Sequence, residues 1–219
     1  MTREYREEKD GIVYEIAKPE HYEDAKRLFL NDFLEREPLA LAAANNNKFK
    51  TDEEQENEDI RRWLTPLLES QLSILAKDAT TNEIIGLRTC KILKKGCAKE
   101  PTVEGSISIY LEDIKNVDFF GKYGVEEVIE FVFLVVKDTH TRRGIAKELV
   151  NRAMEIVKKQ GYRAVIVSAT NPITMNMFEK QKFDMLKELS ISNYTIDGIK
   201  AFPNATAGQV GKLFGKALV

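Results

Sequence analysis

A strand–helix–strand pattern in the second half of the chain restricts its fold more than any other feature. Residues 130–136 form a nearly continuous apolar and β-branched run, which predicts a buried strand. Residues 145–159 have the composition of a helix, and residues 164–168 form a second compact apolar run. Two strands joined through a helix lie parallel, so the segment predicts a βαβ unit inside a larger sheet.

The connection between the first strand and the helix predicts an anion site. Arg142, Arg143 and Gly144 lie directly before the helix, whose first backbone N–H groups have no partner within the helix. These N–H groups and the positive end of the helix dipole favour a phosphate or pyrophosphate. The segment is neither a P-loop nor a dinucleotide fingerprint, because it lacks Gly-Lys-Ser/Thr and Gly-x-Gly-x-x-Gly. The alternative is that the two arginines are ordinary solvated loop cations.

Composition and charge limit the classes of function. With 33 Lys and Arg against 35 Asp and Glu, the net charge is −2, so no overall positive field indicates nucleic acid. Cys90 and Cys97 are too few for a disulfide framework, and His21 and His140 share no spacing typical of metal ligands. We find neither a signal-peptide pattern nor an apolar stretch near the ~20 residues that cross a bilayer. The expectation is a soluble, cytoplasmic protein without a metal.

The rest of the chain predicts further strands and helices without a linker or repeat. Predicted strands cover residues 12–17, 72–76, 83–93, 183–194 and 199–202. Predicted helices cover residues 20–34, a segment from a capping box of Thr51 and Glu54 to Leu68, and residues 170–180. Residues 94–118 read mainly as loop, with either a short helix or a strand at 107–111. The sequence predicts a single α/β domain over residues 1–219.

Two blocks of sequence resemble the GNAT superfamily of acyl-CoA-dependent N-acyltransferases. The signature Gln/Arg-x-x-Gly-x-Gly/Ala matches at Gly144 and Ala146, while Thr141 replaces the first Gln or Arg. The second block covers residues 171–183 and follows the superfamily's pattern of Asn, a small residue, an aromatic and a closing Phe. Lys182 stands in this block where Gly is usual. The resemblance implies a GNAT-like mixed, mostly antiparallel sheet with one parallel βαβ pair, flanked by helices.

Within this superfamily the chain resembles the invertebrate arylalkylamine N-acyltransferase-like group. Residues 33–39 are similar to the group's acidic-Glu-Pro-Leu segment after its first helix. Asn193-Tyr194, Phe202-Pro203 and residues 208–210 are similar to its closing region, where Thr206 replaces a His that members often carry.

The resemblance implies roles for three residues in catalysis. Glu37 is expected to be the general base, with Glu35 as its nearest rival; from the residues alone, Glu37 reads as a surface carboxylate in a charge-rich loop. Thr170 and Thr174 lie one helical turn apart and match two hydroxyl residues of the group, which suggests a proton relay. Helix N-capping by Thr170 or Asn171 is the alternative.

The resemblance also implies a binding site for acetyl-CoA or another acyl-CoA. Backbone N–H groups around Phe133, Leu134 and Val135 would hold the pantetheine arm and the carbonyl. The expected pyrophosphate cradle consists of Arg142, Arg143, Gly144, Ile145, Ala146 and Lys147. Asn171 and Phe178 complete the expected cofactor contacts, and Phe178 replaces a tyrosine that often acts as general acid.

The expected reaction is direct attack of a small primary amine on the acyl thioester in a ternary complex. An arylalkylamine is the expected acceptor, with Trp63, Phe49 and Tyr194 as candidate pocket residues that could equally be core. A polyamine, an amino acid or a protein N-terminus is the alternative acceptor. A GNAT fold that binds acyl-CoA without catalysis is a further alternative, motivated by Thr141 and Phe178. The oligomeric state is left open between monomer and homodimer.

Overall fold

The computed structural model describes residues 5–43, 53–97 and 105–218, with the side chains of residues 53–57 outside the description. The predicted capping box of Thr51 and Glu54 and the candidate pocket residue Phe49 therefore lie outside the described residues.

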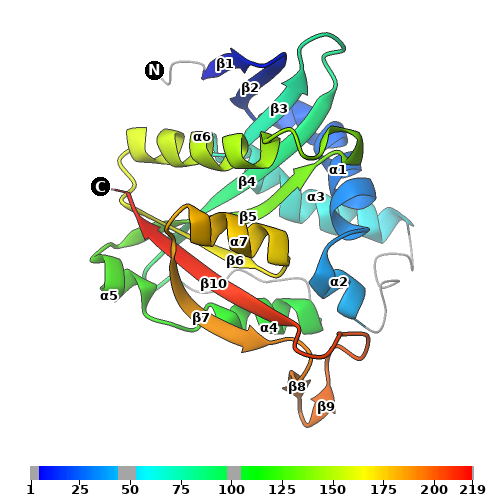
Figure 1. Cartoon of the computed structure of the whole chain (residues 1–219), viewed down its shortest axis with the longest axis vertical. Coiled ribbons are helices and arrows are strands. Elements are labelled where there is room, and N and C mark those ends of the chain that lie inside the picture. Colours follow the sequence, from blue (N-terminus) through cyan, green and yellow to red (C-terminus); the bar gives the residue numbers. More distant parts are fainter. Residues whose placement is uncertain (1–4, 44–52, 98–104, 219) are drawn as a thin grey trace.

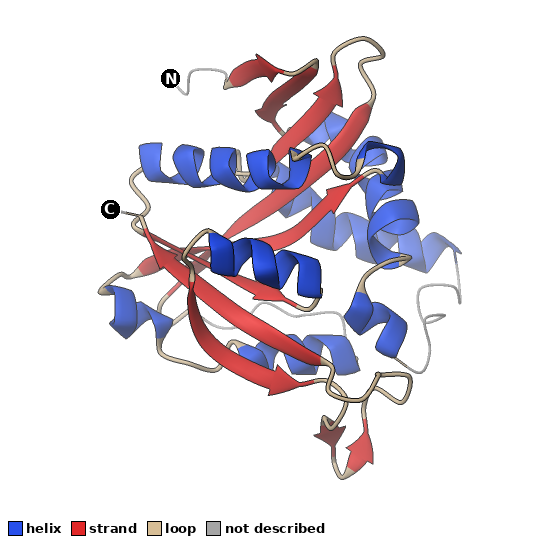
Figure 2. Ribbon diagram, in the orientation of Figure 1, coloured by secondary structure: helices blue, strands red, loops and turns tan. Residues whose placement is uncertain are grey.

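An eight-stranded sheet in the order β1-β2-β3-β4-β5-β6-β10-β7 forms the centre of the molecule (Figures 1 and 2). Only β5 and β6 pair in parallel within it, and its other neighbouring strands are antiparallel. The strands are β1 (Arg6–Lys9), β2 (Ile12–Ile16), β3 (Ile74–Asp78), β4 (Ile84–Lys94), β5 (Glu127–Val136), β6 (Ala164–Ala169), β7 (Asp184–Ser190) and β10 (Val210–Ala217). The predicted mixed sheet with one parallel pair is confirmed.

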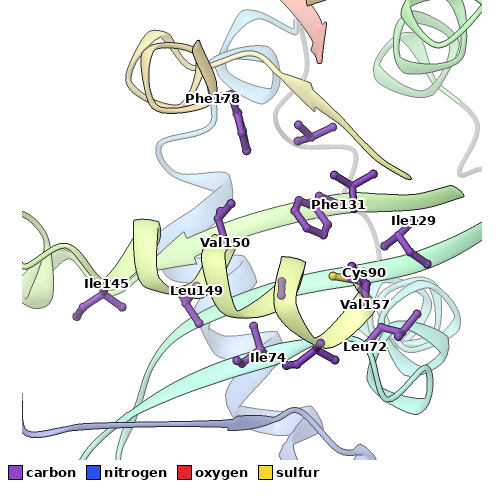
Figure 3. Packing of buried hydrophobic residues seen from close by; sticks show 14 of the residues in the cluster. Leu72, Ile74, Cys90, Ile129, Phe131, Ile145, Leu149, Val150, Val157 and Phe178 are labelled. Carbon is purple, nitrogen blue, oxygen red and sulfur yellow. The ribbon is translucent and has the colours of Figure 1, made fainter. Parts of the chain in front are cut away.

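Helices cover both faces of this sheet (Figure 1). The helices are α1 (Tyr22–Leu28), α2 (Pro38–Ala42), α3 (Glu53–Glu69), α4 (Ser106–Ile114), α5 (Phe119–Tyr123), α6 (Ile145–Lys159) and α7 (Pro172–Lys180). On one face α6 and α7 pack on an apolar cluster that includes Phe131, Val150 and Phe178 (Figure 3). On the other face, residues of α1 and α3 form a second cluster, and residues of α2, α4 and α5 form a third.

Several predicted elements have different bounds or character in the structure. The predicted helix at residues 20–34 is a 3₁₀ turn (Pro19–His21), then α1, then a π-helical segment, η2 (Phe29–Leu34). The segment at residues 107–111 is helical, within α4. The predicted strand at residues 199–202 is shorter in the structure: β9 (Ile199–Lys200) pairs with β8 (Thr195–Ile196) in a separate two-stranded sheet.

The parallel pair opens into a fork that the sequence pattern did not predict. Pairing between β5 and β6 covers only Ile129 to Phe131, although both strands continue beyond it. At the same place β5 holds one extra residue relative to β4, whose Arg88 pairs with Leu134 and whose Cys90 pairs with Phe131. This β-bulge bends the strand and turns Phe133 to the opposite face from Phe131. Beyond Phe131 the edge of β5 on the β6 side is free of strand pairing.

A buried arginine lies beside the root of this fork. The Arg88 guanidinium stacks on the Phe131 ring, with Cζ 4.5 Å from its centroid, and the residue is 2% exposed. Burial lowers its pKa to about 10, so the group remains a cation at neutral pH. The aromatic face partly replaces the water that this charge loses on folding.

Candidate active site

The predicted functional residues come together at one edge of the sheet. Because β5 and β6 are parallel, their carboxyl ends point the same way, and α6 and α7 each begin just after one of these ends. The short helix α2 lies at the same edge (Figure 1). In α/β sheets ligands bind outside the carboxyl ends of parallel strands, so this edge is where a substrate is expected.

The free edge of β5 offers a backbone donor at Leu134. Phe133 donates its N–H to Thr89 Oγ1 of β4 at 3.2 Å, and Lys137 donates to the Ile85 carbonyl at 2.8 Å. Backbone groups of successive strand residues point to alternate sides, so the N–H of Leu134 points away from β4 and toward the fork. Of the three predicted backbone contacts, the N–H of Leu134 therefore faces the fork, whereas the N–H groups of Phe133 and Val135 face β4 and are not available to a ligand there.

The start of α6 has the geometry of an anion cradle. Gly144 is its N-cap residue at φ 77°, and no side chain caps the first turn. Arg142 also has a positive φ of 60°, which is uncommon outside glycine and marks a tight backbone turn. Ile145 is buried in the core and anchors the turn, whereas Arg142, Arg143 and Lys147 are exposed. None of these three cations forms an ion pair with another described residue, so all remain able to bind an anion.

Glu37 lies at the N-terminus of α2, opposite the carboxyl end of β6. Pro38 fixes the first helical residue, and Glu37 itself has the extended conformation of an N-cap. Its Oε2 accepts the N–H of Ala40 at 2.6 Å. Burial raises the pKa of the Glu37 carboxyl, and the hydrogen bonds from Thr170, Ala40 and Leu39 oppose that rise. A carboxylate with a raised pKa suits general-base catalysis near neutral pH.

Thr170, which follows β6, contacts Glu37 at the start of α2 directly. Its hydroxyl donates to Oε1 of Glu37, across a sequence separation of 133 residues. Two residues that were singled out for separate reasons therefore form one hydrogen-bonded pair. Glu35, the rival base, is exposed on the preceding turn.

The other predicted residues of α7 have structural contacts. Asn171 is the N-cap, and its Oδ1 accepts the N–H of Ile173 at 2.9 Å; Thr170 does not cap the helix. Thr174 donates its hydroxyl to the Asn171 carbonyl at 2.8 Å. Phe178 is 1% exposed and contacts Phe183 and Phe214 in the core (Figure 3 labels Phe178). A role of these three residues toward the cofactor or a proton stays a prediction.

The candidate aromatic pocket residues do not form one pocket. Trp63 packs on Phe29 and Phe133 between α3 and β5. Tyr194 packs on Tyr110 and Phe202 in a different cluster. Trp63 and Tyr194 therefore contribute to two different apolar clusters, as the alternative of core residues predicts.

The late loop at residues 204–209 holds α2 in place. Gln209 Nε2 donates to the Pro38 carbonyl at 3.1 Å, and Asn204 donates to the carbonyls of Ala42 and Ala43. These contacts hold both ends of α2, at Pro38 beside Glu37 and at Ala42 and Ala43. No local sequence pattern indicates these contacts, because each joins positions more than 150 residues apart.

The described residues offer neither a reactive thiol at the buried Cys90 nor a cluster of metal ligands. Burial raises the pKa of the Cys90 thiol to about 12, so it stays protonated and is a poor nucleophile. Within the described ranges, no group of His, Cys, Asp and Glu side chains has the arrangement of a metal site. No helix in the described part of the chain is long and apolar enough to span a membrane.

Comparison with known proteins gives a family and several similar folds. The model of the acetyltransferase (GNAT) family matches residues 10–183. A comparison with curated protein sequences gives no match. The structure of mosquito arylalkylamine N-acetyltransferase-like 5b is similar with a TM-score of 0.79 and 19% identity, over 94% of this chain and 99% of that one.

Two further structures have the same fold. Arylalkylamine N-acetyltransferase 2 from Aedes aegypti gives a TM-score of 0.76 at 18% identity, over 96% of this chain and 100% of that one. The polyamine N-acetyltransferase of Drosophila melanogaster, which forms N-acetylagmatine, gives a TM-score of 0.77 at 14% identity, over 94% of this chain and 99% of that one.

The family match includes the bulged strand β5, the cradle at the start of α6 and the second block in α7. Fold, site geometry and family model agree. The chain belongs to the acetyltransferase (GNAT) family of acetyl-CoA-dependent N-acetyltransferases and resembles its invertebrate arylalkylamine group.

Proposed function

We propose that the protein transfers an acetyl or short acyl group from acyl-CoA to a small primary amine, with Glu37 as general base. The observation that carries this proposal is the hydrogen-bonded pair of Glu37 and Thr170 at the fork. The pair unites α2 and the end of β6 beside the free edge of β5, where the thioester is expected to lie.

Each part of the site has a role in this reaction. The N–H of Leu134 polarises the thioester carbonyl, and the start of α6 binds the pyrophosphate with Arg142, Arg143 and Lys147. Glu37 takes a proton from the ammonium group, directly or through a water, and the free amine attacks the carbonyl carbon. The C–N bond forms as the C–S bond breaks, and the second proton of the nitrogen passes to the departing thiolate, so that an amide and the free thiol of CoA result.

An arylalkylamine is the proposed acceptor, and a polyamine is the second candidate. The solved structures of similar fold include arylalkylamine and polyamine N-acetyltransferases, so the fold accommodates both classes of amine. We place the reaction in the cytoplasm, where acetyl-CoA and free amines are both available.

The direct test is thiol release from acetyl-CoA in the presence of a panel of amines. The panel contains an indole-ethylamine, a phenyl-ethylamine, a polyamine and an amino acid. We expect turnover with the arylalkylamines and at least a tenfold lower kcat/KM with the amino acid, whose carboxylate would lie near Glu37.

Two outcomes would overturn parts of the proposal. Preference for the polyamine would change the acceptor class and leave the chemistry intact. Binding of acetyl-CoA by calorimetry without turnover for any amine would instead support a non-catalytic acyl-CoA-binding module.

A further inference from the structure

Arg36, the residue before the proposed base, contacts the end of the donor strand. Its Nη2 donates to the Val136 carbonyl at 2.8 Å, across a sequence separation of 100 residues. Its Nε donates to the Asp32 carbonyl at 2.7 Å, and its Nη1 lies 3.2 Å from Oδ1 of Asp138. A planar guanidinium that uses all three nitrogens in this way fixes the relative position of two backbone segments.

Asp32 completes the contact from the same segment. Its Oδ1 accepts the backbone N–H of Asp138 at 3.0 Å and lies 3.4 Å from Nη2 of Arg36. Arg36 and Asp32 therefore bind the backbone on both sides of Lys137, where β5 ends and the chain turns toward the cradle. We call these two side chains and their backbone partners the β5 clamp.

The β5 clamp acts on the free edge of β5. Since Val136 and Leu134 are two residues apart in one strand, their backbone groups point to the same side, roughly 7 Å apart. Arg36 thus binds the same edge whose Leu134 N–H faces the fork. Glu37 follows Arg36 directly, so any movement of the clamp moves the carboxylate relative to the thioester.

The start of the clamp lies in η2, the π-helical segment (Phe29–Leu34). π-Helical turns are rare in proteins, and those that occur are often found at functional sites. The extra residue in the turn shifts the direction of the chain that follows. Here it brings Asp32 and Arg36 to one side, toward the end of β5. The ion pair between Arg36 and Asp138 is exposed, with 80% of the Asp138 side chain accessible, and contributes little. The contacts to backbone groups therefore provide most of the stabilisation of the β5 clamp.

We infer that Arg36 is a positioning residue that holds Glu37 at a fixed place over the thioester, through the carbonyl of Val136. This inference rests on the proposed role of Glu37 as base. Arg36 itself does not touch the reacting atoms.

The test compares Arg36→Ala, Arg36→Lys and a matched control, Arg27→Ala. Arg27 pairs with Asp24 on α1 and, among the described residues, makes no hydrogen bond or ion pair with β5. Its side chain is 66% exposed, against 40% for Arg36. We measure kcat, the KM of each substrate, the pH dependence of kcat/KM, and thermal unfolding.

We expect Arg36→Ala to lower kcat by about 10- to 100-fold, the effect of displacing a catalytic group by about 1 Å. In this variant Glu37 should be less firmly held and more accessible to water, so burial raises its pKa less. The pH below which activity is lost should therefore also fall. Arg36→Lys should recover part of kcat through a single contact with Val136. Arg27→Ala should match the wild type, and Asp138→Ala should lose little.

An Arg36→Ala protein that keeps the wild-type kcat, or loses kcat without any shift of the pH profile, would overturn the inference. So would an equal loss in Arg27→Ala. Glu37→Gln measured alongside separates this result from the proposed function. If Glu37→Gln keeps the wild-type profile, the base itself is misassigned; if only the Arg36 result fails, the base stands without the clamp.

Discussion

The Glu37 carboxylate is held between two opposing influences on its pKa. Burial raises the pKa, while the hydroxyl of Thr170 and two backbone N–H groups stabilise the charged form and lower it. Burial therefore makes the carboxylate a stronger base, and the hydrogen bonds limit that rise. The sequence alone favoured a surface carboxylate, because local composition does not reveal which distant elements cover a residue.

Replacing Thr170 tests this balance at the level of one hydrogen bond. In Thr170→Val the Glu37 carboxylate loses a hydrogen-bond donor, so its pKa rises. As the pH is lowered, the variant should therefore lose activity at a higher pH than the wild type does. The pH dependence of kcat/KM measures this shift. Thr195→Val is the matched control, because Thr195 lies exposed in the separate sheet of β8 and β9 and its loss should leave the profile in place. An identical shift in both variants would contradict the pairing.

At the scale of elements, the start of α6 and the bulge in β5 form the proposed binding surface for the acyl donor. The sequence predicted α6 at Ile145–Lys159, because its apolar spacing and the preceding Arg-Arg-Gly are local signals. The bulge could not be predicted, since it is set by the register between β4 and β5 and by the Thr89 hydroxyl. The π-helical η2 was likewise read as ordinary helix, because its apolar spacing is nearly the same.

The cradle is tested by the double variant Arg142→Ala with Arg143→Ala. Loss of two unpaired cations at the helix start should weaken CoA binding by about tenfold or more, since a hydrogen bond to a charged group contributes roughly 1.5–3 kcal/mol. Calorimetry with CoA measures the affinity, and the KM of the amine should change much less. Lys200→Ala, an exposed cation of β9, is the control. Unchanged CoA affinity in the double variant would exclude the cradle.

At the scale of the whole molecule, the site depends on contacts between distant parts of the chain. The βαβ unit and the hairpin of β3 and β4 were predictable, because each follows from apolar runs and the turns between them. The mixed, mostly antiparallel sheet was implied by the resemblance to the GNAT superfamily. Strands β1 and β10 were missed: β1 is charged and exposed, and β10 carries Gly211 and Gly215 within its run. Yet β10 lies between β6 and β7 in the sheet.

Those glycines are required by packing that no local pattern contains. A Cβ on Gly211 would come within 2.4 Å of the Tyr110 hydroxyl of α4, and one on Gly215 equally close to that of Tyr123 of α5. Local sequence patterns thus supplied candidate residues for the site, but not the contacts between them. Glu37, Thr170 and Arg36 converge only once the sheet, α2 and the late loop are assembled.

The central claim is that Glu37 acts as the base, and the pH dependence of kcat/KM tests it most directly. A base works only when unprotonated, so wild-type activity should fall as the pH drops through the raised pKa of Glu37, above the ordinary value of 4.5. Glu37→Gln should lose this acidic limb, with activity about 10²- to 10⁴-fold lower at neutral pH and rising only as the amine itself deprotonates. Retention of the wild-type acidic limb and rate in Glu37→Gln would contradict the claim.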